Sequence, residues 1–252
     1  MGSILIYPKG TTAACVCAAT ALGRAGIPTV DHPSPEVTHL LLDVPSFSGD
    51  GTLQGGGSLA ELLERLPDSV TVIGGKLDHP ALAKHRTVDL LQDPEYVAAN
   101  AAITADCAVR IAGSLLPVTF REAPALVLGW GRIGKCLARL LAEMSCPVTV
   151  AARNPKDRAM VGALGGRAVA IGEIPGILPD MRLLFNTVPA PILGSELLGH
   201  YPQCVKIDLA SIPGLLGSDV VYARGLPGQY APESSGALIA RRVLHFIEEE
   251  WS

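Results

Sequence analysis

Short apolar runs alternate with helical stretches along the first half of the chain. Thr38–Val44 is a segment of strand length around the apolar run Leu40–Leu42, which is typical of a buried parallel strand. Thr12–Ala25 is rich in alanine, contains few helix-breaking residues and predicts a helix that Gly26 closes. Other segments predict strands at Ser3–Tyr7, Thr29–Asp31, Val70–Gly74 and Thr87–Leu91, a mobile loop at Phe47–Ser58 and a helix at Leu59–Leu66. This alternation predicts a parallel sheet with helices on its faces.

The second half opens with a clearer pattern of strand, loop, helix and strand. The apolar strand Ala125–Leu128 runs directly into a glycine-rich loop, and the helix Lys135–Met144 and the strand Val148–Ala152 follow. These segments together form one βαβ unit of about 30 residues. Later segments predict strands at Leu183–Asn186 and Val205–Leu209, a turn at Gly225–Gly228 and an amphipathic helix at Ser234–Glu250.

A long helix separates the two halves. Glu95–Leu115 is rich in alanine and nearly free of breakers until Gly113, and Pro94 suits its first turn. We therefore predict an α/β protein of two Rossmann-like domains with parallel sheets, joined by this hinge helix, with a cleft between them. The predicted domains are residues 1–115 and residues 116–252, and the last helix is an element that can also pack back on the first domain.

Composition and charge exclude several classes of protein. The chain has 252 residues, of which 48% are hydrophobic and 17% charged, and its formal net charge is −4. No basic stripe supports nucleic-acid binding, and no apolar run reaches the roughly 18 residues of a membrane helix. The N-terminus lacks the basic start and apolar stretch of a signal peptide. The six cysteines have no metal-binding spacing, so we expect no metal and buried, reduced thiols in a cytoplasmic protein.

The loop after Leu128 carries the main chemical signal. It reads Gly129-Trp130-Gly131-Arg132-Ile133-Gly134 and lies directly between a strand and a helix, the context in which a G-x-G-x-x-G motif binds a dinucleotide. The first glycine allows a tight turn, the second lets the pyrophosphate approach the backbone, and the third lets the helix pack closely on the sheet. The helix N-terminus adds free N–H groups and partial positive charge. The alternative is a glycine-rich turn without a ligand.

The residues after the second strand indicate which dinucleotide binds. An NAD-selective site places Asp or Glu about 20 residues after the loop, where it binds the ribose hydroxyls. This chain has Arg153 there, followed by Asn154, with Lys156 and Arg158 nearby. A guanidinium can bind the 2′-phosphate of NADP by two charge-assisted hydrogen bonds. The sequence therefore predicts NADP, and the alternative is a solvated basic turn.

Two later strand ends are expected to face the nicotinamide half of the cofactor. One ends in Asn186-Thr187-Val188-Pro189, and the other ends in Asp208-Leu209-Ala210-Ser211. Ligands of open parallel sheets lie beyond the carboxyl ends of the strands. Asn186 can equally be an ordinary turn residue.

From about Asp93 to its end, the chain resembles the A-type component of bacterial dipicolinate synthase. The order and spacing of the shared segments fit over about 150 residues, and single motifs also occur in shikimate dehydrogenase and other nicotinamide enzymes. The segments are residues 100–106 (Asn-Ala-Ala-Ile-Thr-Ala-Asp), 127–134, 151–153 (Ala-Ala-Arg), 186–189, 208–211 (Asp-Leu-Ala-Ser), 225–228 (Gly-Leu-Pro-Gly) and 231–232 (Ala-Pro).

The resemblance implies an enzyme with its substrate between two domains. It implies oxidation of a dihydrodipicolinate-type intermediate to dipicolinate by NADP⁺ during sporulation, beside a flavoprotein-like second subunit. The substrate would be a small-molecule carboxylate, and we expect a homo-oligomer such as a dimer. Asn100, Thr104 and Asp106 on the hinge helix would face the cleft, where Asp106 could take a proton as the ring aromatises. The alternative for Asp106 is an ordinary exposed carboxylate.

Three departures from the family pattern leave the substrate open. The first strand runs into Lys9-Gly10-Thr11-Thr12 instead of a Gly-Gly-Asp turn followed by Arg. Ile212 and Glu233 stand where the family has basic residues, and a dianionic substrate would need such cations. Two other functions therefore stay in view: a nucleotide-sensing or scaffolding subunit without catalysis, and a shikimate or hydroxyacid type of dehydrogenase. The dehydrogenase alternative has no Lys–Asp dyad or His/Glu/Arg trio to support it.

Overall fold

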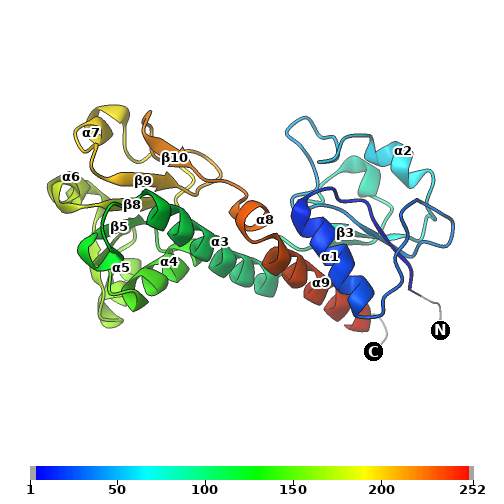
Figure 1. The fold of residues 1–252 in the computed structure, drawn as a ribbon. Helices are drawn as coiled ribbons and strands as arrows, with labels where there is room; N and C mark the ends of the chain where they lie inside the picture. Colours follow the sequence, from blue (N-terminus) through cyan, green and yellow to red (C-terminus); the bar gives the residue numbers. More distant parts are fainter. Residues whose placement is uncertain (1–3, 250–252) are drawn as a thin grey trace. The chain divides into compact units, whose positions relative to one another are not determined.

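The structure, a computed structural model, describes residues 4–249 (Figure 1). Ser3 and Glu250, the expected ends of the first strand and the last helix, lie outside the described residues. The chain forms two compact α/β units, one made of residues up to Asn100 together with the segment from Pro227, the other of Ala101–Leu226. Each unit contains one parallel sheet, which confirms the predicted fold class. Within residues 4–249, no helix is long and apolar enough to cross a membrane.

The first unit is built on a four-stranded parallel sheet with the order β1-β2-β3-β4. A fifth segment extends its edge, because the backbone around Thr29 pairs with Ile6 as an isolated bridge, where the sequence predicts a short strand. The strands are β1 (Ile6–Pro8), β2 (His39–Leu41), β3 (Thr71–Gly74) and β4 (Thr87–Asp89), and the helical elements between them are α1 (Ala13–Arg24), α2 (Leu59–Leu63) and the 3₁₀ turn η1 (Pro80–Leu82).

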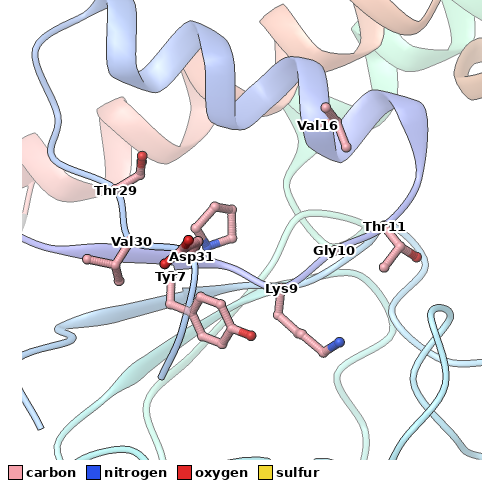
Figure 2. Close-up of a pocket in the computed structure, with 9 residues that line it drawn as sticks. Tyr7, Lys9, Gly10, Thr11, Val16, Thr29, Val30 and Asp31 are labelled. Carbon is pink, nitrogen blue, oxygen red and sulfur yellow. The ribbon is translucent and has the colours of Figure 1, made fainter. Parts of the chain in front are cut away.

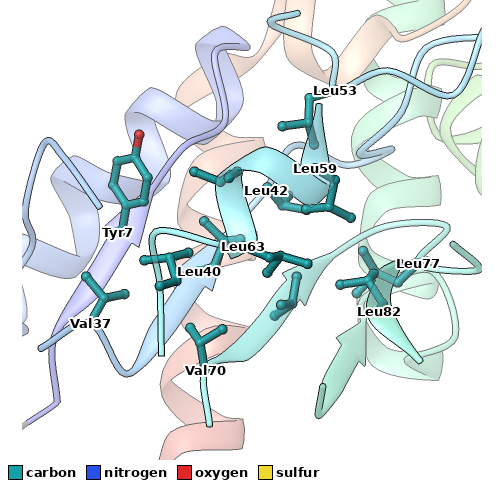
Figure 3. Packing of buried hydrophobic residues seen from close by; sticks show 13 residues of the cluster. Tyr7, Val37, Leu40, Leu42, Leu53, Leu59, Leu63, Val70, Leu77 and Leu82 are labelled. Atoms are coloured by element: carbon teal, nitrogen blue, oxygen red, sulfur yellow. The ribbon is translucent and has the colours of Figure 1, made fainter. Parts of the chain in front are cut away.

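Burial on both faces explains the apolar run Leu40–Leu42 in β2 and directly after it. Leu40 and Leu42 point to one face and join the aliphatic cluster beneath α2 (Figure 3). Leu41 points to the opposite face and is also fully buried, at 0% exposure. A strand covered on both sides needs apolar residues at every position instead of at alternate ones. The cluster also includes the ring of Tyr7, at the end of β1.

The C-terminal helix belongs to the first unit, so the structure divides the chain differently from the predicted boundary at 115/116. This helix, α9 (Pro232–Glu249), packs closely on α1. A Cβ at Gly236 would lie 2.7 Å from the carbonyl oxygen of Ala14. Arg242 of α9 is 7% exposed, lies 2.5 Å from the carboxylate of Asp93 and also pairs with Glu95. Both carboxylates lie at the start of α3 (Pro94–Leu115), which continues into the second unit as the predicted long helix.

The second unit has a six-stranded sheet with the order β10-β9-β8-β5-β6-β7, and every pair is parallel. Counted from its first strand, this is the doubly wound order 3-2-1-4-5-6 of a dinucleotide-binding fold. The strand order reverses at β5, so the loop after β5 lies at the switch point. The strands are β5 (Ala125–Leu128), β6 (Val148–Ala151), β7 (Arg167–Val169), β8 (Leu183–Asn186), β9 (Val205–Asp208) and β10 (Val220–Tyr222), and the helices are α4 (Arg132–Glu143), α5 (Pro155–Ala163), α6 (Ile174–Ile177) and α7 (Ser195–Gly199). The short helix α8 (Leu226–Tyr230) begins at the last residue of this unit and lies mostly in the first.

All six cysteines are free thiols, and four of them are buried, whereas Cys17 and Cys136 are only half-buried. Burial raises the pKa of Cys15 to about 12, and the nearby carboxylate of Asp43 adds to the effect. Burial likewise raises the pKa values of Cys146 and Cys204 to about 11. These three thiols therefore stay protonated at neutral pH and are poor nucleophiles.

Candidate functional site

The loop between β5 and α4 has the backbone that the glycine motif predicts. Gly129 adopts a φ of +98°, a left-handed conformation that side chains disfavour. A Cβ at this position would also lie 2.6 Å from the Oγ1 of Thr187. That hydroxyl donates to the carbonyl oxygen of Leu128 at 2.7 Å and so holds the end of β5 against the end of β8. The tight turn off the strand therefore depends on glycine.

The other two glycines of the motif differ in what surrounds them. Gly134 is buried, and a Cβ there would lie 2.3 Å from the carbonyl oxygen of Gly129. At Gly131 a Cβ would meet nothing within 4 Å, so the space beside it is open. Gly131 is also the N-cap of α4 and has no side chain to accept from the first-turn N–H groups. The loop thus fits a pyrophosphate, with an open approach and uncapped donors at a helix N-terminus.

Strand ends elsewhere in the two sheets are closed by the protein's own carboxylates. After β2, Asp43 accepts from the backbone N–H groups of Thr11 and Thr12, both at 2.9 Å. At the end of β4, Asp89 accepts from the N–H groups of Lys76 at 3.1 Å and Leu77 at 3.0 Å. An anionic ligand would have to displace these carboxylates. The uncapped N–H groups of α4 in the second unit therefore suit phosphate better than the start of α1 in the first.

The basic residues after β6 have separate positions and partners. Arg153 is exposed, and its side chain has no hydrogen-bond or ion-pair partner among residues 4–249. The Nη1 of Arg158 donates to the carbonyl oxygens of Ala152 and Arg153, both at 2.8 Å. Asn154 is the N-cap of α5 and accepts from the N–H of Lys156 at 2.9 Å. Arg158 and Asn154 thus fix the turn, and Arg153 has its guanidinium available for a ligand.

Trp130, the second residue of the motif, carries an unpaired donor. Its side chain is half-buried, and its Nε1 is buried without a hydrogen-bond partner within the described part of the chain. An unpaired buried N–H is costly, so such a group calls for an acceptor. The ammonium of Lys135 lies 6.0 Å from the centre of the indole ring. Of the remaining loop residues, Arg132 is exposed and Ile133 is half-buried.

Asn186 has a structural role in the loop after β8. It is fully buried, and its Nδ2 donates to the carbonyl oxygen of Val188 and to Asp208, both at 3.0 Å. Its Oδ1 accepts from the N–H of Val188, also at 3.0 Å. The side chain therefore holds the turn 186–189, and its two amide hydrogens already have acceptors. The turn-residue alternative describes Asn186 better than direct contact with a nicotinamide.

Asp208, at the end of β9, belongs to a segment that the sequence predicts at this edge, but its role in holding the backbone was not predicted. It is 1% exposed and accepts four hydrogen bonds, from Asn186, from the N–H of Ala210 at 3.0 Å, and from the N–H groups of Gly214 at 2.7 Å and Leu215 at 2.9 Å. Its only sequence signal is a carboxylate at the end of an apolar strand.

The residues that follow Val188 and Asp208 differ in exposure. Leu209 and Ala210 are buried, whereas Pro189 and Ser211 are exposed. At the end of β9, therefore, only the side chain of Ser211 among the three predicted contacts is accessible to a ligand.

The predicted catalytic residues do not share one face of α3. The helix is continuous from Pro94 to Leu115, so Asn100 and Thr104 lie on one side, four residues apart, and Asp106 points elsewhere. Thr104 is 8% exposed, whereas Asp106 is exposed. Asp106 therefore lies on a different side of α3 from Thr104, because residues two apart on a helix do not face each other, and the catalytic roles of the three residues stay a prediction.

Comparison with known proteins supports the resemblance inferred from the motifs. No family model matches the chain. Over 239 residues it is 27% identical to the dipicolinate synthase A protein of Bacillus subtilis (strain 168), an alignment covering 86% of this chain and 80% of that protein.

Solved structures extend the likeness to the fold. The dipicolinate synthase A protein from Bacillus halodurans superposes with a TM-score of 0.82 and 22% identity, over 96% of each chain. A transhydrogenase from Sinorhizobium meliloti superposes with a TM-score of 0.68 and 13% identity, over 98% of this chain and 94% of that one. The chain thus has the two-domain Rossmann-like fold of dehydrogenase-type oxidoreductases, and it is similar to the dipicolinate synthase A proteins in sequence as well as in fold.

Proposed function

We propose that this protein is an NADP-dependent oxidoreductase of the dipicolinate synthase A type. It oxidises a dihydrodipicolinate-type intermediate to dipicolinate and acts beside a flavoprotein-like second subunit. The observation that carries the proposal is the open phosphate loop at Gly129–Gly134, with uncapped N–H groups at α4 and an unpartnered Arg153 after β6. The similarity to the dipicolinate synthase A protein supports the choice of substrate.

The chain's own residues would bind and orient the dinucleotide. The first-turn N–H groups of α4 bind the pyrophosphate beside Gly131, and Trp130 Nε1 donates to an acceptor at the same loop. Arg153 binds the 2′-phosphate, while Arg158 holds the carbonyl oxygens behind it. A bound nicotinamide would supply the hydride acceptor, and a base of the chain or water would take the proton that the dihydro ring loses on oxidation.

Arg153 tests the choice between NADP and NAD. We expect Arg153→Ala to weaken NADP⁺ binding by about 10-fold or more, because a charge-assisted hydrogen bond to phosphate is lost. The affinity for NAD⁺, which lacks that phosphate, should change little. Isothermal titration of both nucleotides against both proteins measures the effect.

Arg167→Ala is the matched control, because Arg167 is exposed at the start of β7, at the opposite end of the sheet. Equal losses for the two variants, or wild-type protein that binds NAD⁺ as tightly as NADP⁺, would overturn the assignment of Arg153.

Asp106 is the residue that we propose as proton acceptor, acting apart from Asn100 and Thr104. It is an exposed carboxylate on α3. We expect Asp106→Asn to lower kcat by about 10-fold and to leave NADP⁺ affinity unchanged, because solvent can partly replace an exposed base. Asp180→Asn, an exposed carboxylate in the same unit, serves as the control. An unchanged kcat and pH profile in Asp106→Asn would remove Asp106 from the mechanism.

The reaction itself is tested with dihydrodipicolinate generated in situ. We expect absorbance at 340 nm to rise as NADPH forms, and dipicolinate to accumulate in equal amount. The assay is run with and without the partner flavoprotein.

A nucleotide-sensing role is the second candidate, and two residues favour it. Ile212 is 55% exposed and Glu233 is also exposed, at positions where a dianionic substrate would need cations. NADP⁺ binding without any NADPH formation, with or without the partner, would establish this second candidate and reject the enzyme.

A further inference from the structure

The two units differ in the loop that follows their first strand. In the first unit this loop borders an open pocket of about 780 Å³ (Figure 2), and the N–H groups of Thr11 and Thr12 at the start of α1 donate to the carboxylate of Asp43. In the second unit the corresponding loop, after β5, contains Trp130, whose Nε1 is buried without a hydrogen-bond partner in residues 4–249. A donor that still needs an acceptor therefore lies in the glycine loop.

The position of the Trp130 ring explains why this donor stays unpaired. Nε1 is the one hydrogen-bonding group of an indole, and here it lies out of contact with solvent. Water cannot serve as acceptor for an atom that it cannot touch, and an oxygen of a ligand cannot reach Nε1 while the ring keeps this position. An unpaired buried N–H raises the free energy of the arrangement, so an acceptor at the loop favours a rotation of the ring toward it.

The surroundings of Trp130 permit such a rotation. The residue is half-buried, so part of its side chain already faces solvent. Gly129 and Gly131 flank it in the chain and have no side chains to restrict the indole. A Cβ at Gly131 would meet nothing within 4 Å, so the space beside this part of the loop is open.

Lys135 contacts the ring in its observed position. The ammonium lies 6.0 Å from the centre of the Trp130 indole, at the outer limit of a cation–π contact. Lys135 is exposed and lies in the first turn of α4, close to the uncapped N–H groups. A phosphate attracts an ammonium more strongly than an aromatic face does, because it carries full negative charge and accepts hydrogen bonds. A pyrophosphate at this loop therefore draws Lys135 away from the ring.

We propose that Trp130 is a positioning residue with two orientations, and that dinucleotide binding switches it from one to the other. In the empty loop Nε1 is buried and Lys135 lies over the indole face. When the pyrophosphate binds, Lys135 moves to the phosphates, the indole turns, and Nε1 donates to an oxygen of the cofactor. The inference rests on the proposed function for the dinucleotide itself, and it adds the rotation of the ring and the part of Lys135 in it.

Tryptophan fluorescence of the whole chain tests the switch directly. The background variant is Trp251→Phe, which removes the other tryptophan of the sequence, so that the emission reports Trp130 alone. The ligands are NADP⁺ and 2′-phospho-ADP-ribose, which has the same pyrophosphate but no nicotinamide ring to quench the indole. We expect both ligands to shift the emission maximum to longer wavelength, because a hydrogen bond from Nε1 to a charged oxygen stabilises the excited indole.

Variants at both residues separate the switch from a simple packing role. Trp130→Phe keeps an aromatic ring but loses the donor, and we expect it to bind NADP⁺ about 10-fold more weakly in isothermal titration. Lys135→Met removes the charge, and we expect about 5-fold weaker binding. Its empty form should already emit at longer wavelength, because the ring is no longer held and Nε1 can reach water.

Arg139→Gln is the matched control for Lys135→Met. Arg139 lies one turn further along α4 and pairs with Glu143 on the surface. This variant should keep the emission and the NADP⁺ affinity of the background protein, because a surface ion pair contributes little. Thermal melting of each variant shows that it is folded before binding is compared.

Three results would overturn the switch. They are NADP⁺ binding in titration with no change of Trp130 emission from either ligand, equal NADP⁺ affinity with and without Trp130→Phe, and identical behaviour of Lys135→Met and Arg139→Gln. Each of them leaves the proposed function intact, because binding itself is then demonstrated. Wild-type protein that binds neither NADP⁺ nor NAD⁺ would instead reject the proposed function and the switch together.

Discussion

Replacement of Gly134 by alanine is expected to abolish nucleotide binding. The new Cβ would lie 2.3 Å from the carbonyl oxygen of Gly129, a backbone atom that cannot rotate away. Either α4 must move off β5 or the turn at Gly129, whose φ is +98°, must change. Both movements displace the N–H groups at the start of α4 that we propose for the pyrophosphate. We expect NADP⁺ affinity to fall by more than about 100-fold and stability to fall by about 2 kcal/mol.

Gly131→Ala is the matched control, since a Cβ there meets nothing within 4 Å and its φ of −78° suits any residue. We expect this variant to melt at the wild-type temperature. Its nucleotide affinity should still fall, because the added methyl group occupies the space proposed for the pyrophosphate. Titration and thermal melting of both variants separate packing from ligand contact. Full NADP⁺ affinity in Gly134→Ala would contradict the proposed loop function.

Replacement of Asp208 by asparagine is expected to destabilise the second unit by about 4 kcal/mol, because two buried donors would lose their acceptor. The carboxylate accepts four hydrogen bonds, two on each oxygen. An amide of the same shape replaces one oxygen with an NH₂ group, which then faces two other donors. The donors of Gly214 and Leu215 are backbone N–H groups, which cannot rotate toward another acceptor.

Urea denaturation followed by circular dichroism measures this loss. Asp180→Asn, an exposed aspartate of the same unit, should change stability by less than about 0.5 kcal/mol. NADP⁺ affinity should also fall in Asp208→Asn, since Asn186 and the turn after β8 depend on this carboxylate. Equal urea midpoints for the two variants would show that the hydrogen bonds of Asp208 contribute little.

Features that depend on neighbours in the chain were predictable. The strand, glycine loop and helix around Gly129–Gly134 form from one continuous segment, and the structure has β5 at the predicted residues and α4 beginning three residues before the predicted start, at Arg132. The long helix α3 also follows from local composition, because alanine-rich segments without breakers favour helix. The strand Leu183–Asn186 agrees with the structure at both ends.

Features that depend on distant partners were not predictable in the same way. Asn186 and Asp208 are 22 residues apart, and only the pairing of β8 with β9 makes one the hydrogen-bond partner of the other. The ion pair of Arg242 with Asp93 spans 149 residues and ties α9 to the first unit. Such contacts depend on the packing of whole elements, for which no short sequence pattern exists.

The sequence by itself determined the α/β class and the glycine loop between strand and helix, and it supplied the basic residue on which the proposal of NADP rests, since each follows from hydrophobic periodicity or from residue types at short spacing. Only the tertiary structure decided which of the polar residues are available to a ligand. It showed Asp43, Asn186 and Asp208 engaged in closing strand ends, Arg153 exposed after β6, and the Nε1 of Trp130 buried without a partner in residues 4–249. The physical reason is that a polar side chain is available to a ligand only when the fold brings no other hydrogen-bond partner to it. Many of those partners are backbone groups of other strands, which lie far away in the sequence.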